Sequence, residues 1–246
     1  MTRSTGLWFA LAAACMSFSA GADSLRDVRS AVGKLTARSP VRATYAVNLS
    51  VKASGKLANQ TSARTLAVEV AHDGNGVTIT VPQEIVEKAW QGATRDDAQH
   101  AIDGIRPSSL IEALDFRASL LDLLSHATVV TESRVSYRGA PARLLILKLD
   151  APARKKKNEI VIGNVKVVED RMSMWVSDDN LPLAAERVRK TSAGFLVFRA
   201  ESSSRTHLTF SRAGDRLVLA RLESASGGSA LGTKIDESSV QTMTVR

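Results

Sequence analysis

Apolar and polar side chains alternate along much of this 246-residue chain, as they do in strands with one buried face. The clearest example is residues 41–51, where the odd positions are apolar and most even positions are polar. Similar runs at 63–71 and 77–81 flank the turn sequence Asp73-Gly74-Asn75-Gly76, whose Gly and Asn residues suit the backbone of a hairpin. These three segments are therefore predicted to form an antiparallel meander.

Other segments have the three-to-four-residue apolar spacing of helices. Residues 23–36 carry such a stripe, and Ser24 followed by Asp27 resembles a capping box. Residues 109–126 carry a wider leucine-rich stripe, so this segment is predicted to be one helix packed against another element. A shorter helix is predicted at 83–91.

From residue 128 onward the chain is predicted to be almost all strand, because short apolar runs alternate with turn residues. In the run 144–149 both faces are apolar, so both must be covered, one of them by the helix at 109–126. The predicted fold is mainly β (α+β), with about ten or eleven strands. The expected late strands are 129–137, 142–149, 160–168, 172–176, 183–188, 195–200, 205–210, 216–222 and a weak last one at 240–245. Turns are expected at 138–141, 178–180, 192–194 and 213–215, and a Gly/Ser stretch at 224–228 precedes the last strand.

The N-terminal residues follow the plan of a cleavable signal peptide. Arg3 precedes an apolar stretch at 6–18, and Ala20-Gly21-Ala22 is a small-x-small cleavage site. We therefore expect residues 1–22 to be removed and residues 23–246 to form a single domain in the periplasm or outside the cell. The apolar stretch is too short for a mature membrane-spanning helix, and no other segment approaches the length needed.

The single cysteine, Cys15, lies inside this leader. Cleavage after Ala22 would leave no thiol for a disulfide or a thiolate metal site. The alternative is cleavage before Cys15, which would give a lipoprotein anchored through that residue. Ala12 stands three positions before it, where a bacterial lipoprotein signal usually has leucine.

The formal net charge is +8, and the basic residues are scattered apart from Arg154-Lys155-Lys156-Lys157. The favoured interpretation of this run is a solvated hairpin tip. The alternative, in an exported protein, is that it binds an anionic membrane surface. Nucleic acid is not an expected partner, because only 4% of residues are aromatic and no basic stripe has aromatics between its charges.

Motifs for catalysis, metal binding and nucleotide binding are missing from the sequence. Gly228-Ser229-Ala230-Leu231 lacks the second glycine of a nucleophile elbow, and no two histidines have the spacing of metal ligands. We expect no cofactor, no metal and no catalytic site. A Ser–His–Asp triad assembled from distant residues stays open.

Two sequence elements resemble the periplasmic lipoprotein carrier superfamily, which includes LolA/LolB-like proteins and the sensor-binding domain of RseB. Residues 174–183 (MWVSDDNLPL) look like the family's strand, acidic turn, Leu-Pro and strand, and residues 137–142 (YRGAPA) look like its Tyr-x-Gly hairpin. The resemblance implies an incomplete antiparallel β-barrel with helices packed on its concave face. It also implies an apolar cavity that takes up acyl chains.

Three functions are compatible with this sequence. The leading hypothesis is a periplasmic, non-catalytic carrier or binding protein for a lipid, a lipoprotein acyl group or another amphiphile. The alternative is an envelope adaptor or stress-signalling module that binds a protein partner, and the third is an exported hydrolase. The candidate ligand-lining residues of the carrier, each with plain hydrophobic core as its alternative role, are Leu144, Ile146, Val165, Val167, Trp175, Phe198, Phe210 and Leu219.

Overall fold

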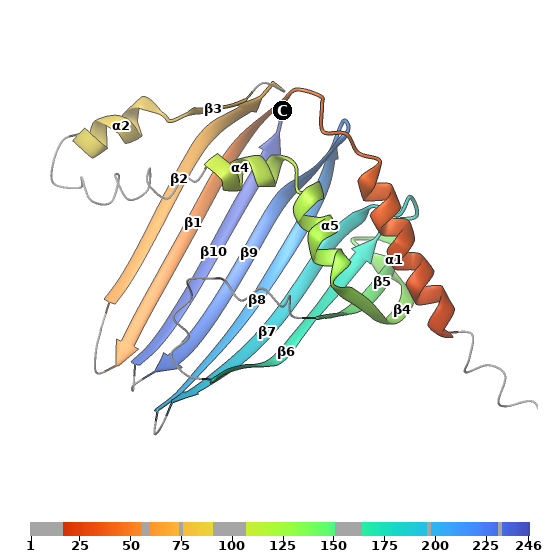
Figure 1. Ribbon diagram of the computed structural model, residues 1–246. Helices are drawn as coiled ribbons and strands as arrows, with labels where there is room; N and C mark the ends of the chain where they lie inside the picture. Colours follow the sequence, from red (N-terminus) through yellow and green to blue (C-terminus); the bar gives the residue numbers. More distant parts are fainter. Residues whose placement is uncertain are drawn as a thin grey trace, which may run out of the picture.

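Ten strands form one antiparallel sheet in the computed structural model (Figure 1), in the order β3-β2-β1-β10-β9-β8-β7-β6-β5-β4. The structure describes residues 17–55, 60–73, 76–90, 107–150, 164–195, 198–230 and 233–246. The two ends of the order, β3 and β4, do not pair with each other, so the sheet is open. The strands are β1 (Val41–Gly55), β2 (Gln60–His72), β3 (Val77–Thr80), β4 (Ala127–Tyr137), β5 (Ala140–Leu149), β6 (Asn164–Val176), β7 (Pro182–Phe195), β8 (Phe198–Ala213), β9 (Arg216–Ala230) and β10 (Thr233–Val245).

The helices of the described chain are α1 (Ser17–Gly33), α2 (Gln83–Trp90), α4 (Pro107–Leu114) and α5 (Arg117–Ser125). The sheet curves around α4 and α5, which lie across one of its faces (Figure 1), and α1 packs against α5 and β4. We call the face covered by α4 and α5 the inner face and the opposite one the outer face. This arrangement confirms the predicted mainly β fold, an incomplete barrel with helices on its concave side.

One strand pair joins distant parts of the sequence. Each of the other neighbouring pairs connects strands that follow one another along the chain, whereas β1 pairs with β10. Their register runs from Ala43 opposite Val245 to Gly55 opposite Thr233. This pair joins the N-terminal meander to the C-terminal strands and makes them one sheet.

The hydrophobic core lies between the inner face and the helices. The leucines on the undersides of α4 and α5 are fully buried, and the rings of Phe116, between the helices, and Phe210, on β8, have centroids 5.5 Å apart. Because side chains alternate between the two faces of a strand, every second residue of the central strands reaches this core. Its largest fully buried apolar members are Leu110, Leu114, Leu120, Leu124, Leu145, Leu147, Met172, Met174 and Leu217.

The predicted helix at 109–126 is wrong in one respect, because the segment forms two helices with a break at Asp115 and Phe116. A carboxylate oxygen of Asp115 accepts a hydrogen bond from the backbone amide of Arg117 (3.3 Å). The amide of Phe116 donates to the carbonyl of Leu217 on β9 (2.8 Å). These bonds satisfy the backbone at the break and let the chain change direction over the sheet.

Helix α1 begins at Ser17, six residues before the predicted start, so Ser24 lies within the helix rather than capping it. The Ser24 side chain is buried, and its hydroxyl donates to the carboxylate of Glu132 on β4 (2.7 Å). Arg143 on β5 donates to both Ser24 (2.9 Å) and Glu132 (3.2 Å). A residue that resembled a helix cap therefore attaches α1 to the edge of the sheet.

Several predicted boundaries in the second half of the chain were also wrong. The predicted strand 172–176 and residues 164–168 of the one before it are parts of a single strand, β6. The run 195–200 spans the end of β7 and the start of β8, and the predicted turn 192–194 lies within β7. The Gly/Ser stretch 224–228, left out of the predicted strands, belongs to β9, where Gly227 pairs with Asp236 on one side and Ser203 on the other. Small residues stay in strand here because both neighbouring strands pair with their backbone.

The predicted turns after β4, β6 and β8 are confirmed by their backbone conformations. Arg138 and Gly139 both have positive φ, 53° and 84°, as a tight hairpin requires. Asn180 has φ 64° and Gly214 has φ 62°, values that Asn and Gly adopt more readily than other residues.

Candidate functional site

Three hydrogen bonds hold the helix pair α4–α5 over the inner face. Two are made at the junction of the helices and one at the C-terminal end of α5. These attachments come from α1, the α1–β1 linker and β9, so they join the helices to three separate parts of the chain. The Phe116 amide bonds the Leu217 carbonyl, the Arg117 guanidinium donates to the Leu35 carbonyl, and the Arg29 guanidinium donates to the Leu124 carbonyl.

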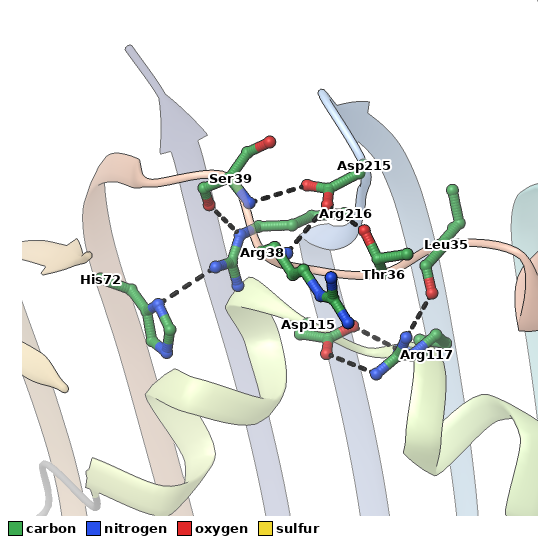
Figure 2. A network of polar contacts seen from close by, with 9 residues as sticks. All are labelled: Leu35, Thr36, Arg38, Ser39, His72, Asp115, Arg117, Asp215 and Arg216. Carbon is green, nitrogen blue, oxygen red and sulfur yellow. Dashed lines mark hydrogen bonds and ion pairs between the residues drawn. The ribbon is translucent and has the colours of Figure 1, made fainter. Parts of the chain in front are cut away.

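The linker between α1 and β1 is held by Asp215 in the β8–β9 hairpin (Figure 2). The Asp215 carboxylate accepts hydrogen bonds from the Thr36 hydroxyl and from the backbone amides of Arg38 (2.8 Å) and Ser39 (3.1 Å). The amide of Ala37 donates to the backbone carbonyl of Asp215 (3.1 Å). The Thr36 hydroxyl and the backbone donors stabilise the ionised carboxylate, which lowers the pKa of Asp215 well below its usual range.

This lowered pKa predicts a pH-dependent effect of Asp215→Asn. The ionised carboxylate contributes stability above the unfolded-state pKa of about 3.9, and that contribution is lost as the pH falls through the lower folded-state pKa. We expect the variant to have a lower urea midpoint than wild type near neutral pH and a smaller deficit below about pH 3. Urea unfolding of both proteins across this range checks the prediction, and a deficit independent of pH would contradict it.

Arg216 is buried beside the same linker, with 2% of its surface exposed. Its Nε donates to the carbonyl of Ser39 (2.7 Å), and its Nη2 lies 3.1 Å from Nδ1 of His72 on β2 (Figure 2). Arg117 and Asp115, at the break between α4 and α5, form an ion pair nearby (3.6 Å). The Arg216 side chain of β9 therefore contacts both the α1–β1 linker and β2, close to the junction of α4 and α5.

The inner face changes from apolar to polar along its strands. A row of side chains at the helix-covered end is entirely apolar, whereas the rows two and four residues further on, about 7 and 14 Å along the strands, contain mostly hydroxyls and charges. The apolar row is Leu222, Leu208, Ala185, Met174 and Leu145 on β9 to β5. We call the following residues the polar floor: Ser224, Thr206 and Arg187, then Ser226, Ser204, Arg189 and Asp170.

An apolar margin, formed by Val47, Leu49 and Val51 of β1, lies on the same inner face, separated from this floor by β10. The three side chains are half-buried, in contrast to the fully buried start of the same strand. Leu49 pairs with Ser239 of β10, which in turn pairs with Ser224 of the polar floor. The margin therefore lies about 10 Å from the floor, the width of two strand spacings.

Tyr45 lies at the end of the apolar margin nearest the core. Its hydroxyl donates to the side-chain carbonyl of Gln241 (3.1 Å), and burial raises its pKa above the usual value. The phenol therefore stays neutral and hydrogen-bonded at neutral pH. This gives the margin an uncharged polar group beside its aliphatic side chains.

The ligand-lining residues predicted from the sequence are divided between the two faces. Phe210 and Leu219 are buried on β8 and β9. Leu144 and Trp175 pair across β5 and β6 on the outer face, half-buried, and the Trp175 ring contacts that of Tyr137 (5.5 Å).

The other predicted lining residues do not extend either group into one cavity. Ile146 lies two residues beyond Leu144 on the outer face and is also half-buried. Val167 stands opposite Thr191 beside a register shift in β6 and is exposed. Val165 and Phe198 lie in β6 and β8, but their side chains are outside the described part of the structure. A ligand-lining role for the whole set stays a prediction.

Sequence reasoning missed the polar floor and the apolar margin as a site. Arg187, Arg189 and Asp170 belong to no motif, and the serines of β9 lie in the Gly/Ser stretch outside the predicted strands. The strand pattern at 41–51 did place the margin residues on one face. Which strands would lie beside them was a matter of long-range pairing.

The outer face is hollowed between β1 and β7. Two adjoining hollows of about 800 and 570 Å³ share Lys190, Ser203, Gly227 and Asp236. These residues lie on the outer face because each alternates with a residue of the inner face along its strand. The hollows are lined mostly by small and charged side chains, with Val168 lining one and Val188 the other.

The described part of the chain offers neither a metal site nor a membrane-spanning helix. Among the described residues there is no group of three or more His, Cys, Asp or Glu side chains placed to hold a metal ion. None of the described helices has the length and apolar character of a transmembrane span. The basic run 154–157 and Cys15 lie outside the described residues.

Solved structures similar to this chain include the following two. A DUF1329 family protein from Desulfovibrio piger is 11% identical with a TM-score of 0.32, and the match covers 94% of this chain and 92% of that one. A LolA superfamily protein from Nitrosomonas europaea is 11% identical with a TM-score of 0.26, covering 92% of this chain and 93% of that one. No protein-family model and no curated protein matches the sequence. Both TM-scores are too low to support an argument about this chain. Its fold is therefore described from its own strand order and helix placement.

Proposed function

We propose that this protein binds an amphiphile on the inner face of its sheet without changing it chemically, as a carrier or binding protein in the periplasm. The observation that carries the proposal is the inner face itself, where an apolar margin on β1 and a floor of hydroxyls and charges lie on either side of β10. An amphiphile's tail would lie along Val47, Leu49 and Val51, and its polar end would lie over the floor. Removal of a tail from water is worth about 0.8 kcal/mol for each buried methylene.

A ligand that reaches from the apolar margin to the polar floor would have favourable contacts for both its tail and its polar end. The half-buried margin supplies apolar contact, while Ser224, Ser226, Ser204 and Thr206 supply hydroxyls that donate and accept hydrogen bonds. A purely apolar ligand would leave the hydroxyls without partners, and a purely polar one would leave the margin in water. The combination therefore supports an amphiphile. The predicted leader at 1–22 supports the periplasmic location.

The proposal predicts that a charge on the apolar margin will prevent binding. We expect Leu49→Glu to weaken binding of a fluorescent fatty-acid analogue at least tenfold, or about 1.4 kcal/mol, because the tail would have to desolvate a carboxylate. Fluorescence titration of the purified protein measures the affinity. Circular dichroism of each variant checks that the sheet is intact.

The neighbouring residue gives a matched control. Ser50 is exposed on the outer face of β1, so Ser50→Glu adds the same charge one position along the same strand. This variant should keep the wild-type affinity. Equal loss of affinity in both variants, or none in Leu49→Glu, would remove the inner face as the binding site.

The outer face favours a second candidate, an adaptor that binds a protein. Trp175 contacts the rings of Tyr137 and His207 there, next to the half-buried Leu144. Native mass spectrometry of the protein purified gently from its own envelope separates the two functions. A mass excess that disappears on solvent extraction supports the carrier, whereas a co-purified protein of defined mass and no small ligand supports the adaptor.

A further inference from the structure

The polar floor contains a cluster of three charged side chains, Arg187, Arg189 and Asp170, which the binding of an uncharged amphiphile would not require. Arg187 donates two hydrogen bonds to the carboxylate of Asp170, from Nε (2.8 Å) and Nη2 (2.7 Å). Nε of Arg189 lies 3.7 Å from the same carboxylate. The Asp170 side chain is 7% exposed, whereas those of Arg187 and Arg189 are 33% and 48% exposed. The carboxylate is thus enclosed while both guanidinium groups reach solvent.

These three side chains carry a net positive charge. Two guanidinium groups against one carboxylate leave one positive charge, because an arginine stays protonated at all ordinary pH values. Their bidentate contact orients Arg187, since the planar group is fixed by two parallel bonds. Guanidinium groups bind carboxylates and phosphates in this planar geometry better than an ammonium group does.

The charged cluster lies directly beside the hydrophobic core. Arg187 stands directly opposite Met172, which is 1% exposed and belongs to the hydrophobic core. On its other side Arg187 pairs with Thr206, and Arg189 pairs with Ser204. The positive charge therefore lies at the boundary between buried apolar side chains and hydroxyls. An opposing charge, Glu237, lies in the same row on β10, two strands away from Ser204, or about 10 Å.

We propose that Arg187 and Arg189 hold an anionic headgroup, so that the ligand of the inner face is an anionic amphiphile carrying a phosphate or carboxylate. This inference rests on the proposed function and names the class of its ligand. Asp170 acts as a positioning residue, because its carboxylate fixes Arg187 and places Arg189 beside it. The hydroxyls of Ser204 and Thr206 supply further donors to the same anion.

The test compares headgroups on one tail. Dodecyl phosphate and the uncharged dodecyl maltoside, both below their critical micelle concentrations, are titrated by calorimetry into the wild-type protein and two variants. Inorganic phosphate alone is titrated as well. We expect wild type to bind dodecyl phosphate at least tenfold more tightly than dodecyl maltoside and to have no measurable affinity for inorganic phosphate.

The two variants remove the same charge from opposite faces of β7. Arg189→Gln should reduce the preference for dodecyl phosphate at least fivefold and leave the affinity for dodecyl maltoside unchanged. Lys190→Gln is the control, since Lys190 pairs with Glu169 on the outer face and should change neither affinity. Arg189→Gln is used because Arg187 makes both short contacts to the enclosed Asp170, so its replacement also threatens the fold.

The outcomes separate this inference from the proposed function. Binding of both amphiphiles with equal affinity, or an equal loss of preference in Arg189→Gln and Lys190→Gln, overturns the headgroup site and leaves the carrier function standing. Tight binding of inorganic phosphate that depends on Arg189 overturns the headgroup site in favour of a site for a free anion. Failure of wild type to bind either amphiphile overturns the proposed function and the inference with it.

Discussion

Replacement of Leu114 by alanine should lower the free energy of unfolding by about 2–5 kcal/mol. Leu114 is fully buried on the underside of α4, among the core residues between the helices and the inner face. Truncation removes its apolar contacts and leaves a cavity that the packed sheet can only partly fill. Urea denaturation followed by circular dichroism measures the change, with the slope of the transition kept as a check on two-state behaviour.

Ile111 on the same helix provides the control for this prediction. It is 45% exposed and three positions from Leu114, so Ile111→Ala removes a side chain of similar size that contacts the sheet much less. We expect it to cost about 1 kcal/mol or less. Similar losses for the two variants would mean that α4 is not packed on the sheet through the face containing Leu114.

The second large effect should come from Arg216→Met, which we expect to destabilise the protein by about 2–4 kcal/mol. Methionine has similar length but cannot donate hydrogen bonds. The carbonyl of Ser39 and Nδ1 of His72 would each lose a contact to a buried guanidinium. Both contacts are partly buried, so each acceptor would lose a charged donor that water replaces only in part.

We expect this loss because Arg216 is buried. Replacement of the exposed Arg212 on the same hairpin is the control. Arg212 lies at the other end of the same hairpin, is exposed, and donates to the Gly214 carbonyl (2.9 Å). Arg212→Met should change the free energy of unfolding by about 0.5 kcal/mol or less. Thermal and urea unfolding of both variants measure the difference. A loss from Arg212→Met as large as that from Arg216→Met would show that removal of any arginine here is destabilising.

Local features of the fold were predictable from the sequence because they depend on neighbouring residues. Alternation at 41–51 determined which side chains of β1 share a face, and the leucine stripe at 109–126 determined that this segment must pack on an apolar surface. The positive-φ positions Gly139, Asn180 and Gly214 marked three hairpins. Each of these predictions needs only the geometry of one strand, helix or turn.

Other boundaries depended on pairing across the sheet. Ser226 and Gly227 have weak strand propensity, yet β8 and β10 pair with the backbone on both sides and keep them in β9. The break at Asp115 and Phe116 depended on the Leu217 carbonyl, which lies about a hundred residues further along the chain. Local propensity cannot report a hydrogen-bond partner at such a separation.

By itself the sequence determined the first three strands, three hairpin turns, the residues sharing a face on β1 and the need for a helix cover. Only the tertiary structure decided that β1 lies beside β10, and so that only β10 separates the apolar margin with Leu49 from the serines of β9. It also decided that Asp170, Arg187 and Arg189 share the inner face and that Arg216 is buried against Ser39 and His72. Alternation along one strand assigns its side chains to two faces. Which residues lie beside each face depends on long-range strand pairing and burial, which the local sequence does not specify.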